Sequence, residues 1–85
     1  MSTSATANDD RVADVQVSDH MLTVILRDGR TISAPLVWFP RLQDASAEHR
    51  AVWEPAAAGH GIHWPLIDED LSINGLLEWH PTTDG

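Results

Sequence analysis

The stretch that decides the fold is MLTVILRDGRTISAP, running from Met21 to Pro35. Two runs rich in β-branched and aliphatic residues, 21–26 and 31–34, lie on either side of Asp28-Gly29. Because glycine accepts a positive φ without steric cost, Asp-Gly between two apolar runs predicts a tight β-hairpin. Pro35 ends the second of these strands.

A third strand is predicted over residues 12–17, where β-branched residues alternate with polar ones over part of the segment. Three antiparallel strands with one apolar face need a covering layer. The chain after Pro35 supplies candidates for it. Pro40 is suited to the first turn of a short helix, and Ser46 is suited to capping another.

The helix after Ser46 is predicted to run to Trp53 and to end at Pro55. Helical spacing places five residues of this region on one face: Leu42, Ala45, His49, Val52 and Trp53. A loop of small residues is expected over 56–61, followed by a short strand over 62–64. Residues 71–77 fit a strand and turn as well as a short helix capped by Ser72, and both readings stay open.

These segments predict an α+β fold, a small antiparallel sheet of three to four strands with one or two short helices. The expected organisation is a flexible N-terminal tail (1–10), one globular domain (11–79) and a loose C-terminal tail (80–85). The chain of 85 residues is long enough for one domain.

Thirteen acidic residues face five arginines, and the formal net charge is −8. This balance argues against direct binding to nucleic acid or to an anionic membrane. It leaves a basic protein partner, a metal, imitation of nucleic acid, or solubility alone. Cysteine is absent, which excludes disulfides and thiolate chemistry. No targeting or membrane-spanning segment is recognisable, so the expected location is the cytoplasm.

Two clusters contain side chains that can ligate metals or transfer protons. His60 and His63 have the spacing of metal ligands, but glycines on both sides of His60 break any helix and no second ligand pair is present, so they are weak candidates and no metal site is predicted. We expect the run Asp68-Glu69-Asp70 to lie on one exposed loop, with Asp68 or Asp70 turned inward to cap amides or meet an arginine and with Glu69 solvated. Its carboxylates are suited to acid–base work, but no hydrophobic segment of the sequence encloses them. We therefore expect no catalytic residue, no cofactor and no enzymatic activity.

Tryptophan is abundant for a chain of this size, with four residues. Trp53 and Trp64 lie in apolar segments and are expected to be mostly buried, whereas Trp79 borders the polar tail and is expected to be more exposed. Tryptophan and arginine are also the residues that anchor protein interfaces. The candidate partner-binding residues are Trp38, Arg41, Arg50, His63, Trp64, Asp68, Glu69 and Asp70.

An ordered series of short motifs resembles a bacterial family catalogued as domain of unknown function 2442. The series comprises Asp28-Gly29-Arg30, Pro35-Leu36, Trp38-Phe39-Pro40-Arg41-Leu42, the residues Ala45, Glu48, Arg50 and Trp53, Gly61-Ile62-His63-Trp64-Pro65, Ile67-Asp68-Glu69-Asp70-Leu71-Ser72 and Leu76-Leu77. The resemblance implies a small mixed α/β domain. Some members look like regulators that carry a helix-turn-helix, which this chain lacks, and others accompany a small partner gene as in toxin–antitoxin pairs.

The first function predicted is therefore a non-enzymatic acidic interaction domain that binds a protein partner of basic character and regulates or neutralises it. One alternative is an acidic nucleic-acid mimic of phage or mobile-element origin, for example an inhibitor of a CRISPR effector. Another is a small metal-assisted hydrolase. The sequence leaves the partner and the oligomeric state open.

Overall fold

The hairpin predicted around Asp28-Gly29 joins β3 (Met21–Leu26) to β4 (Thr31–Pro35) in the computed structural model, which describes residues 9–78. Gly29 has a φ of 96°, as the prediction requires. The Leu26 amide donates to the Arg30 carbonyl at 2.9 Å, and the Gly29 amide donates to the Leu26 carbonyl at 3.0 Å. β2 (Val12–Val17) pairs with the other side of β3, so the first sheet is antiparallel with the order β2-β3-β4.

A bulge in β2 explains why its alternation of apolar and polar residues is incomplete. The register against β3 shifts between Val12 and Asp14, so Ala13 is an extra residue in the strand. An extra residue turns the following side chains to the opposite face. Val12 and Val15 are three positions apart, yet both are buried in the same core.

Three single-turn helices follow the first sheet: η1 (Leu36–Trp38), α1 (Pro40–Gln43) and α2 (Ala47–Arg50). Pro40 opens α1, as predicted. Ser46 caps α2, and its hydroxyl oxygen accepts a hydrogen bond from the His49 amide at 3.1 Å.

The predicted helix from Ser46 to Trp53 is wrong in its length, because α2 already ends at Arg50. The extended backbone of Ser46, with ψ of 159°, separates α2 from α1, so the two helices share no continuous face. Leu42 is fully buried, whereas His49 and Val52 are exposed.

The structure adds a second antiparallel sheet, which has the order β5-β6-β7. Its elements are β5 (Glu54–Ala56), the turn η2 (Ala57–Gly59), β6 (Gly61–Trp64) and β7 (Glu69–Ser72), and the helix α3 (Ile73–Glu78) follows. Pro55, predicted to end a helix, lies instead in β5 at the edge of the sheet, where its missing N–H removes no hydrogen bond to β6. For residues 71–77, elements of both readings are present: β7 ends at Ser72, whose hydroxyl caps α3 by accepting from the Gly75 amide at 2.9 Å.

The turn η2 between β5 and β6 is left-handed. Ala57, Ala58 and Gly59 have φ values of 53°, 58° and 94°. Left-handed backbone costs a non-glycine residue about 1–2 kcal/mol, so two alanines here are strained. Gly59 is buried, and a Cβ at this position would lie 3.0 Å from the Cβ of Arg11.

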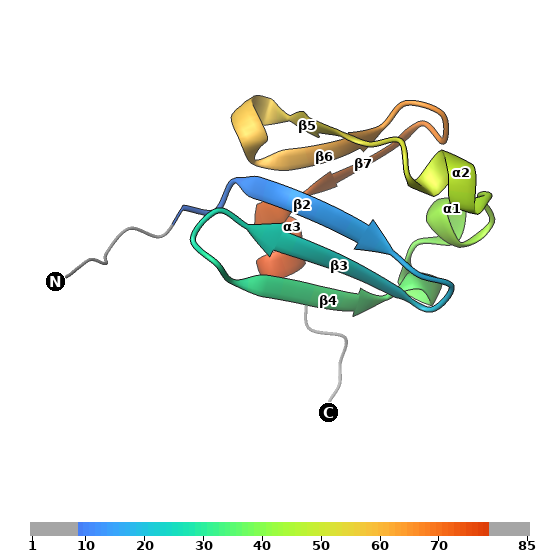
Figure 1. Cartoon of the computed structure of the whole chain (residues 1–85), viewed down its shortest axis with the longest axis horizontal. Helices are drawn as coiled ribbons and strands as arrows, with labels where there is room; N and C mark the ends of the chain where they lie inside the picture. The colour runs from blue at the N-terminus through green and yellow to red at the C-terminus, as the bar shows by residue number, and fades with distance from the viewer. Residues whose placement is uncertain (1–8, 79–85) are drawn as a thin grey trace, which may run out of the picture.

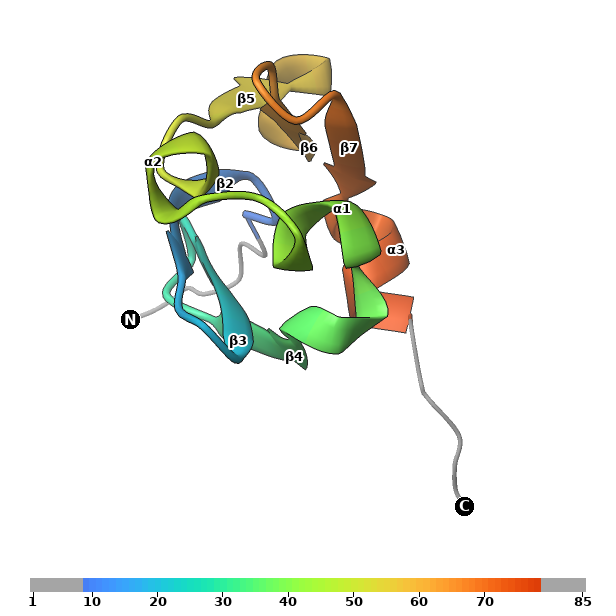
Figure 2. The same ribbon diagram turned by 90° about the vertical axis from the view of Figure 1, so that its right-hand side faces the viewer.

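Both sheets and the short helices enclose one core (Figures 1 and 2). The buried hydrophobic residues are Val12, Val15, Leu22, Val24, Leu26, Ala34, Leu36, Phe39, Leu42, Ile62, Trp64, Ile73 and Leu76. The α+β class and the single small domain are therefore confirmed. None of the helices within residues 9–78 is long and apolar enough to cross a membrane. The predicted C-terminal tail, the exposure of Trp79 and most of the predicted N-terminal tail lie outside the described residues.

Ion pairs cluster where the chain before β2 meets the hairpin loop, and the pair between Arg30 and Asp10 joins these two segments. Asp9 binds Arg11 through two side-chain hydrogen bonds of 2.8 Å. Arg30 binds both Asp28 and Asp10. The side-chain hydrogen bonds from Arg11 lower the pKa of Asp9 to about 2, and the Arg30 amide, assisted by its side chain, lowers the pKa of Asp28. These carboxylates are therefore ionised partners of arginine well into the acidic range.

Candidate protein-binding site

The β6–β7 hairpin carries five of the candidate residues, which are His63, Trp64, Asp68, Glu69 and Asp70. The Ile67 and Asp68 amides both donate to the Trp64 carbonyl, at 3.2 and 2.9 Å. This closes a tight turn in which Asp68 has a φ of 59°. Leu66, which is 55% exposed, projects from the same turn. The hairpin therefore presents an apolar side chain next to the acidic run.

The three acidic residues do not lie on one loop, contrary to the expectation from the sequence. Asp68 lies in the turn, whereas Glu69 and Asp70 begin β7. Glu69 is partly buried, and its carboxylate accepts a hydrogen bond from the Asp70 amide at 3.2 Å. The side chains of Asp68 and Asp70 are 90% and 70% exposed. Glu69 was expected to be the solvated member, but Asp68 and Asp70 are more accessible.

Strand register aligns Glu54, His63 and Asp70 in one row across the second sheet. His63 Nδ1 lies 2.8 Å from Asp70 Oδ1. The three side chains share the face of the sheet opposite to Ile62 and Trp64, because side chains alternate along a strand. The sequence does not reveal Glu54 as part of this row, because a helix is predicted up to Pro55 and the proline and alanines after Glu54 have low strand propensity.

Arg41 reaches the hairpin from α1. Its guanidinium donates to the Asp68 carbonyl at 3.1 Å and lies 3.8 Å from the Asp68 carboxylate. Both side chains are largely exposed, so this contact contributes little to stability. It does place one cation beside the acidic run, which brings Arg41, His63, Asp68, Glu69 and Asp70 into one neighbourhood.

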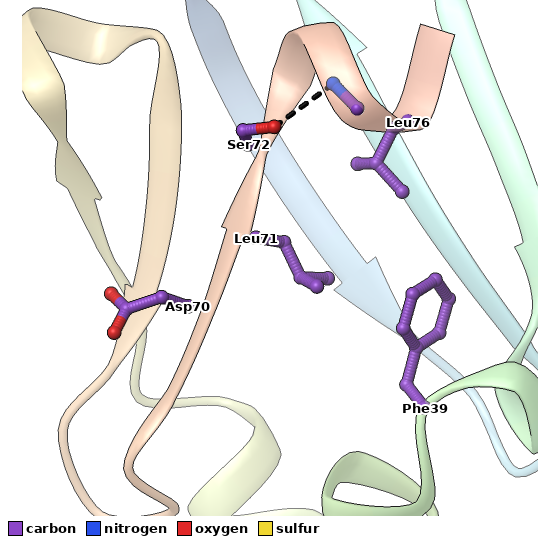
Figure 3. A pocket seen from close by; sticks show the side chains of 6 residues that line it. Phe39, Asp70, Leu71, Ser72 and Leu76 are labelled. Carbon is purple, nitrogen blue, oxygen red and sulfur yellow. Dashed lines mark hydrogen bonds between the residues drawn. The ribbon is translucent and has the colours of Figure 1, made fainter. Parts of the chain in front are cut away.

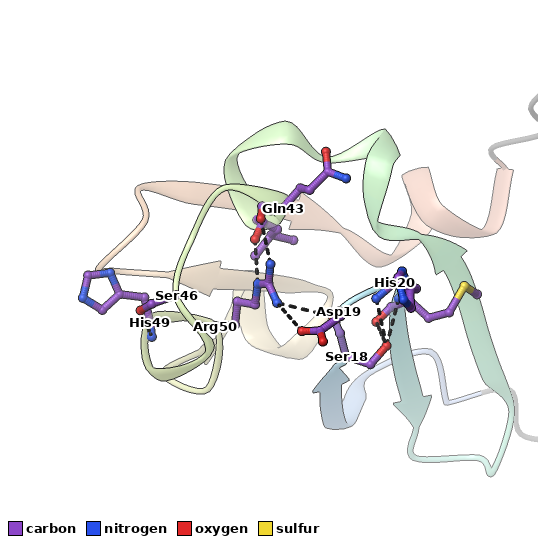
Figure 4. Close-up of polar contacts among 9 residues, drawn as sticks. Ser18, Asp19, His20, Gln43, Ser46, His49 and Arg50 are labelled. Carbon is purple, nitrogen blue, oxygen red and sulfur yellow. Dashed lines mark hydrogen bonds and ion pairs between the residues drawn. The ribbon is translucent and has the colours of Figure 1, made fainter.

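Arg50 and Trp64, two further candidates, lie inside the domain. Arg50 is 9% exposed, and its guanidinium donates to the carbonyls of Leu42 at 2.8 Å and Gln43 at 2.7 Å. It also contacts the Ser18 carbonyl and lies 3.6 Å from the Asp19 carboxylate in the turn between β2 and β3 (Figure 4). Trp64 is fully buried, as predicted. These contacts give both residues a structural role.

The two other tryptophans among residues 9–78, Trp38 and Trp53, are intermediate in solvent exposure. Trp38 lies in η1, away from the β6–β7 hairpin in sequence, and packs partly buried against the core. Trp53 is also partly exposed but packs against that core, which agrees with the mostly buried position that the sequence predicts. Arg41, Asp68 and Asp70 are therefore the accessible part of the predicted set, and His63 and Glu69 are partly accessible.

Charge is divided unevenly between the two halves of the domain. Residues 9–43 contain five acidic residues and four arginines, a net charge of −1. Residues 44–78 contain seven acidic residues and one arginine, a net charge of −6. That one arginine is the buried Arg50. The excess negative charge of the domain therefore belongs to the second sheet and the segments beside it.

Two pockets share the strand β7. One, of about 440 Å³, lies over the small residues of the second sheet and is lined by Ala56, Ala57, His60, Gly61, Ile62, Asp70, Leu71 and Ser72. The other, of about 240 Å³, is lined by Phe39, Asp70, Leu71, Ser72, Gly75 and Leu76 (Figure 3). Within residues 9–78, no three side chains of the kinds that ligate metals come close enough together to hold an ion.

Comparison with known proteins places this fold. The sequence profile of the DUF2442 family, described as a protein of unknown function, matches residues 12–82. A crystal structure of a protein of unknown function from Rhodospirillum rubrum is similar, with 32% sequence identity and a TM-score of 0.66, and the match covers 79% of this chain and 83% of that one. No curated protein is significantly similar to the chain. The resemblance seen in the sequence is thus confirmed, and the chain belongs to the DUF2442 family of proteins of unknown function.

Proposed function

We propose that this chain is a non-enzymatic interaction domain that binds a basic protein partner through its second sheet, and thereby regulates or neutralises that partner. The observation that carries the proposal is the uneven charge: residues 44–78 have a net charge of −6, and their only arginine is buried. Such a surface attracts a basic partner and repels acidic ones, which raises the rate of correct encounters.

The geometry of the second sheet supports this role. Glu54 and Asp70 flank His63 in a row across the exposed face. Next to that row, Ala56 and Gly61 leave a shallow depression that Asp70 and Ser72 border. A lysine or arginine side chain fits this combination, because its aliphatic part packs on small residues while its charge meets a carboxylate.

A binding role accounts for the exposed carboxylates better than catalysis does. Acid–base groups of enzymes work in enclosed sites that exclude water. Asp68 and Asp70 keep 90% and 70% of their side-chain surface in solvent. Exposed carboxylates of this kind form the outer part of an interface.

The test begins with affinity capture from the native host, after which the captured protein is purified and its Kd is measured against two charge reversals. Asp70→Lys places a cation in the proposed interface. Asp14→Lys is the control, because it places the same cation on the first sheet, outside that interface. A repulsive contact at an interface costs several kcal/mol, so Asp70→Lys should weaken binding by about tenfold or more, and Asp14→Lys by less than about twofold. Circular dichroism should show that both variants are folded.

Equal affinities of the two variants would refute the proposed surface. Competition by duplex DNA supplies a separate check, because a partner displaced from this domain by DNA would support the nucleic-acid mimic instead. A partner that stays bound while DNA is present supports the regulatory domain.

A further inference from the structure

The outer edge of β7 has hydrogen-bonding groups that the second sheet does not use. β7 is the last strand of the order β5-β6-β7 and pairs with β6 on one side only. The Ile73 amide donates to the His60 carbonyl at 2.9 Å. This bond continues the ladder between β7 and β6 and shows which residues of β7 direct their backbone groups toward β6. Since backbone groups alternate in direction along an antiparallel strand, those of Glu69 and Leu71 face β6, and those of Asp70 and Ser72 face outward.

Two of these outward groups are available for another chain. The Asp70 amide is occupied by the Glu69 carboxylate at 3.2 Å. The Ser72 carbonyl lies at the start of α3, where the helix uses it. The Asp70 carbonyl and the Ser72 amide are left, and no backbone group among residues 9–78 pairs with either. One residue of a parallel strand pairs with a carbonyl and an amide spaced in this way, by donating to the first and accepting from the second.

An apolar pocket lies directly beside this edge. Its volume is about 240 Å³, and Figure 3 shows around it Leu71 of β7, Leu76 of α3 and Phe39, which lies between η1 and α1. Asp70 points to the other side of β7 in the same view. A strand added next to β7 would place alternate side chains on these two sides. One side meets apolar carbon, and the other meets a carboxylate.

We propose that the edge of β7 takes an extended segment of the partner as a fourth, parallel strand. An apolar side chain of that segment fills the pocket between Phe39, Leu71 and Leu76, and a neighbouring lysine or arginine lies beside Asp70. The inference rests on the proposed function and specifies its binding mode, in which backbone hydrogen bonds give affinity and the pocket gives specificity. Charge complementarity selects this occupant, because the edge lies in the half of the domain with a net charge of −6.

The experiment uses the full chain labelled with ¹⁵N and an end-blocked octapeptide of alternating lysine and valine. Two matched probes accompany it: the same peptide with every second backbone amide methylated, and an octapeptide of alternating glutamate and valine. We expect the first peptide to shift the amide resonances of residues 69–76 and to slow hydrogen exchange at Ser72. The methylated peptide and the acidic peptide should each bind at least about tenfold more weakly than the first peptide.

Asp70→Asn should weaken the lysine–valine peptide by about two- to fivefold, as expected for one exposed ion pair, without altering the fold. Leu76→Met keeps the core volume and changes the pocket wall. It should therefore change the ratio between the affinities for a lysine–leucine peptide and for the lysine–valine peptide. Shifts centred on other residues, or equal binding of the methylated peptide, would overturn the inference. So would concentration-dependent shifts at the same amides without peptide, since they would identify a second copy of this chain as the occupant.

This outcome is separable from that of the proposed function. If the peptide fails but the captured partner is lost on Asp70→Lys, the charged surface is correct and the strand addition is wrong. If the peptide binds at β7 but the captured partner is indifferent to Asp70→Lys, the proposed function fails.

Discussion

Arg50 and Trp64 are joined by a buried hydrogen bond, in which the Trp64 indole Nε1 donates to the Arg50 carbonyl at 3.1 Å. The same arginine donates through its side chain to the carbonyls that end α1. Arg50 therefore connects the second sheet, the short helices and, through Ser18, the first sheet. In a domain whose helices are one turn long, this residue satisfies carbonyls that the helices cannot satisfy themselves.

Replacement of Arg50 by lysine should lower the free energy of unfolding by about 2–3 kcal/mol. A lysine cannot reach the Leu42 and Gln43 carbonyls at once, and a hydrogen bond to a charged group contributes about 1.5–3 kcal/mol. Urea denaturation measures the change. Arg41→Lys is the matched control and should stay within about 0.5 kcal/mol, because Arg41 and its partner Asp68 are exposed. Equal losses in the two variants would contradict the role of Arg50.

Trp64→Phe should also destabilise the domain, by about 1–3 kcal/mol, because the change leaves the Arg50 carbonyl without its donor and removes buried volume. Single-tryptophan variants give a milder check of the same burial. Acrylamide should quench the fluorescence of Trp64 much less than that of Trp53, which is only partly buried. Equal quenching of the two would show that Trp64 is accessible.

Gly59→Ala should cost more stability than Gly29→Ala, although both glycines have φ near 95°. At Gly29 a Cβ meets nothing within 4 Å, so only the backbone strain of about 1 kcal/mol applies. At Gly59 the Cβ would also press on Arg11 at 3.0 Å, and the total should exceed about 2 kcal/mol. Thermal unfolding of both variants measures the difference. A smaller loss at Gly59 would mean that Arg11 moves aside freely.

The stability of the domain should fall as the pH is lowered through the acidic range, and Asp9 and Asp28 should account for part of that fall. Their pKa values are lower in the folded chain than the ordinary value of 3.8, and that of Asp9 is about 2. A lowered pKa gives stability that is complete above the unfolded value and is lost as the pH falls through the folded one.

The double variant Asp9→Asn/Asp28→Asn should therefore be less stable than the wild type at pH 6, with a flatter pH dependence between about pH 4 and pH 2. Chemical denaturation at a series of pH values measures both. Parallel curves for the two proteins would show that these ion pairs do not persist in solution.

Binding of the proposed partner should weaken with salt, mainly through the association rate. Charges on the surface are screened beyond about 8 Å at physiological ionic strength, and complementary fields act on encounter more than on dissociation. Stopped-flow measurements at several salt concentrations separate the two rates. An association rate that does not change with salt concentration would mean that the net charge of −8 serves solubility alone.

The sequence by itself determined the first sheet, because its signals are local. The turn needs a positive φ at Gly29, and the strands on either side of it are rich in β-branched and aliphatic residues, so neighbours in the chain suffice to define the hairpin. The caps at Ser46 and Ser72 are equally local, since each hydroxyl accepts from an amide three residues later. The short motifs that indicate the family can likewise be recognised without the structure.

Only the tertiary structure decided the second sheet and the role of its residues. β5 and β7 are three and four residues long, which is too short for a periodic pattern, and they exist because β6 pairs with both. Register across those strands, rather than spacing along the chain, aligns Glu54 with His63 and Asp70. Arg50 is buried because carbonyls from the turn before β3 and from the end of α1 converge on it, and residues 8 and 32 positions away are brought together only by folding.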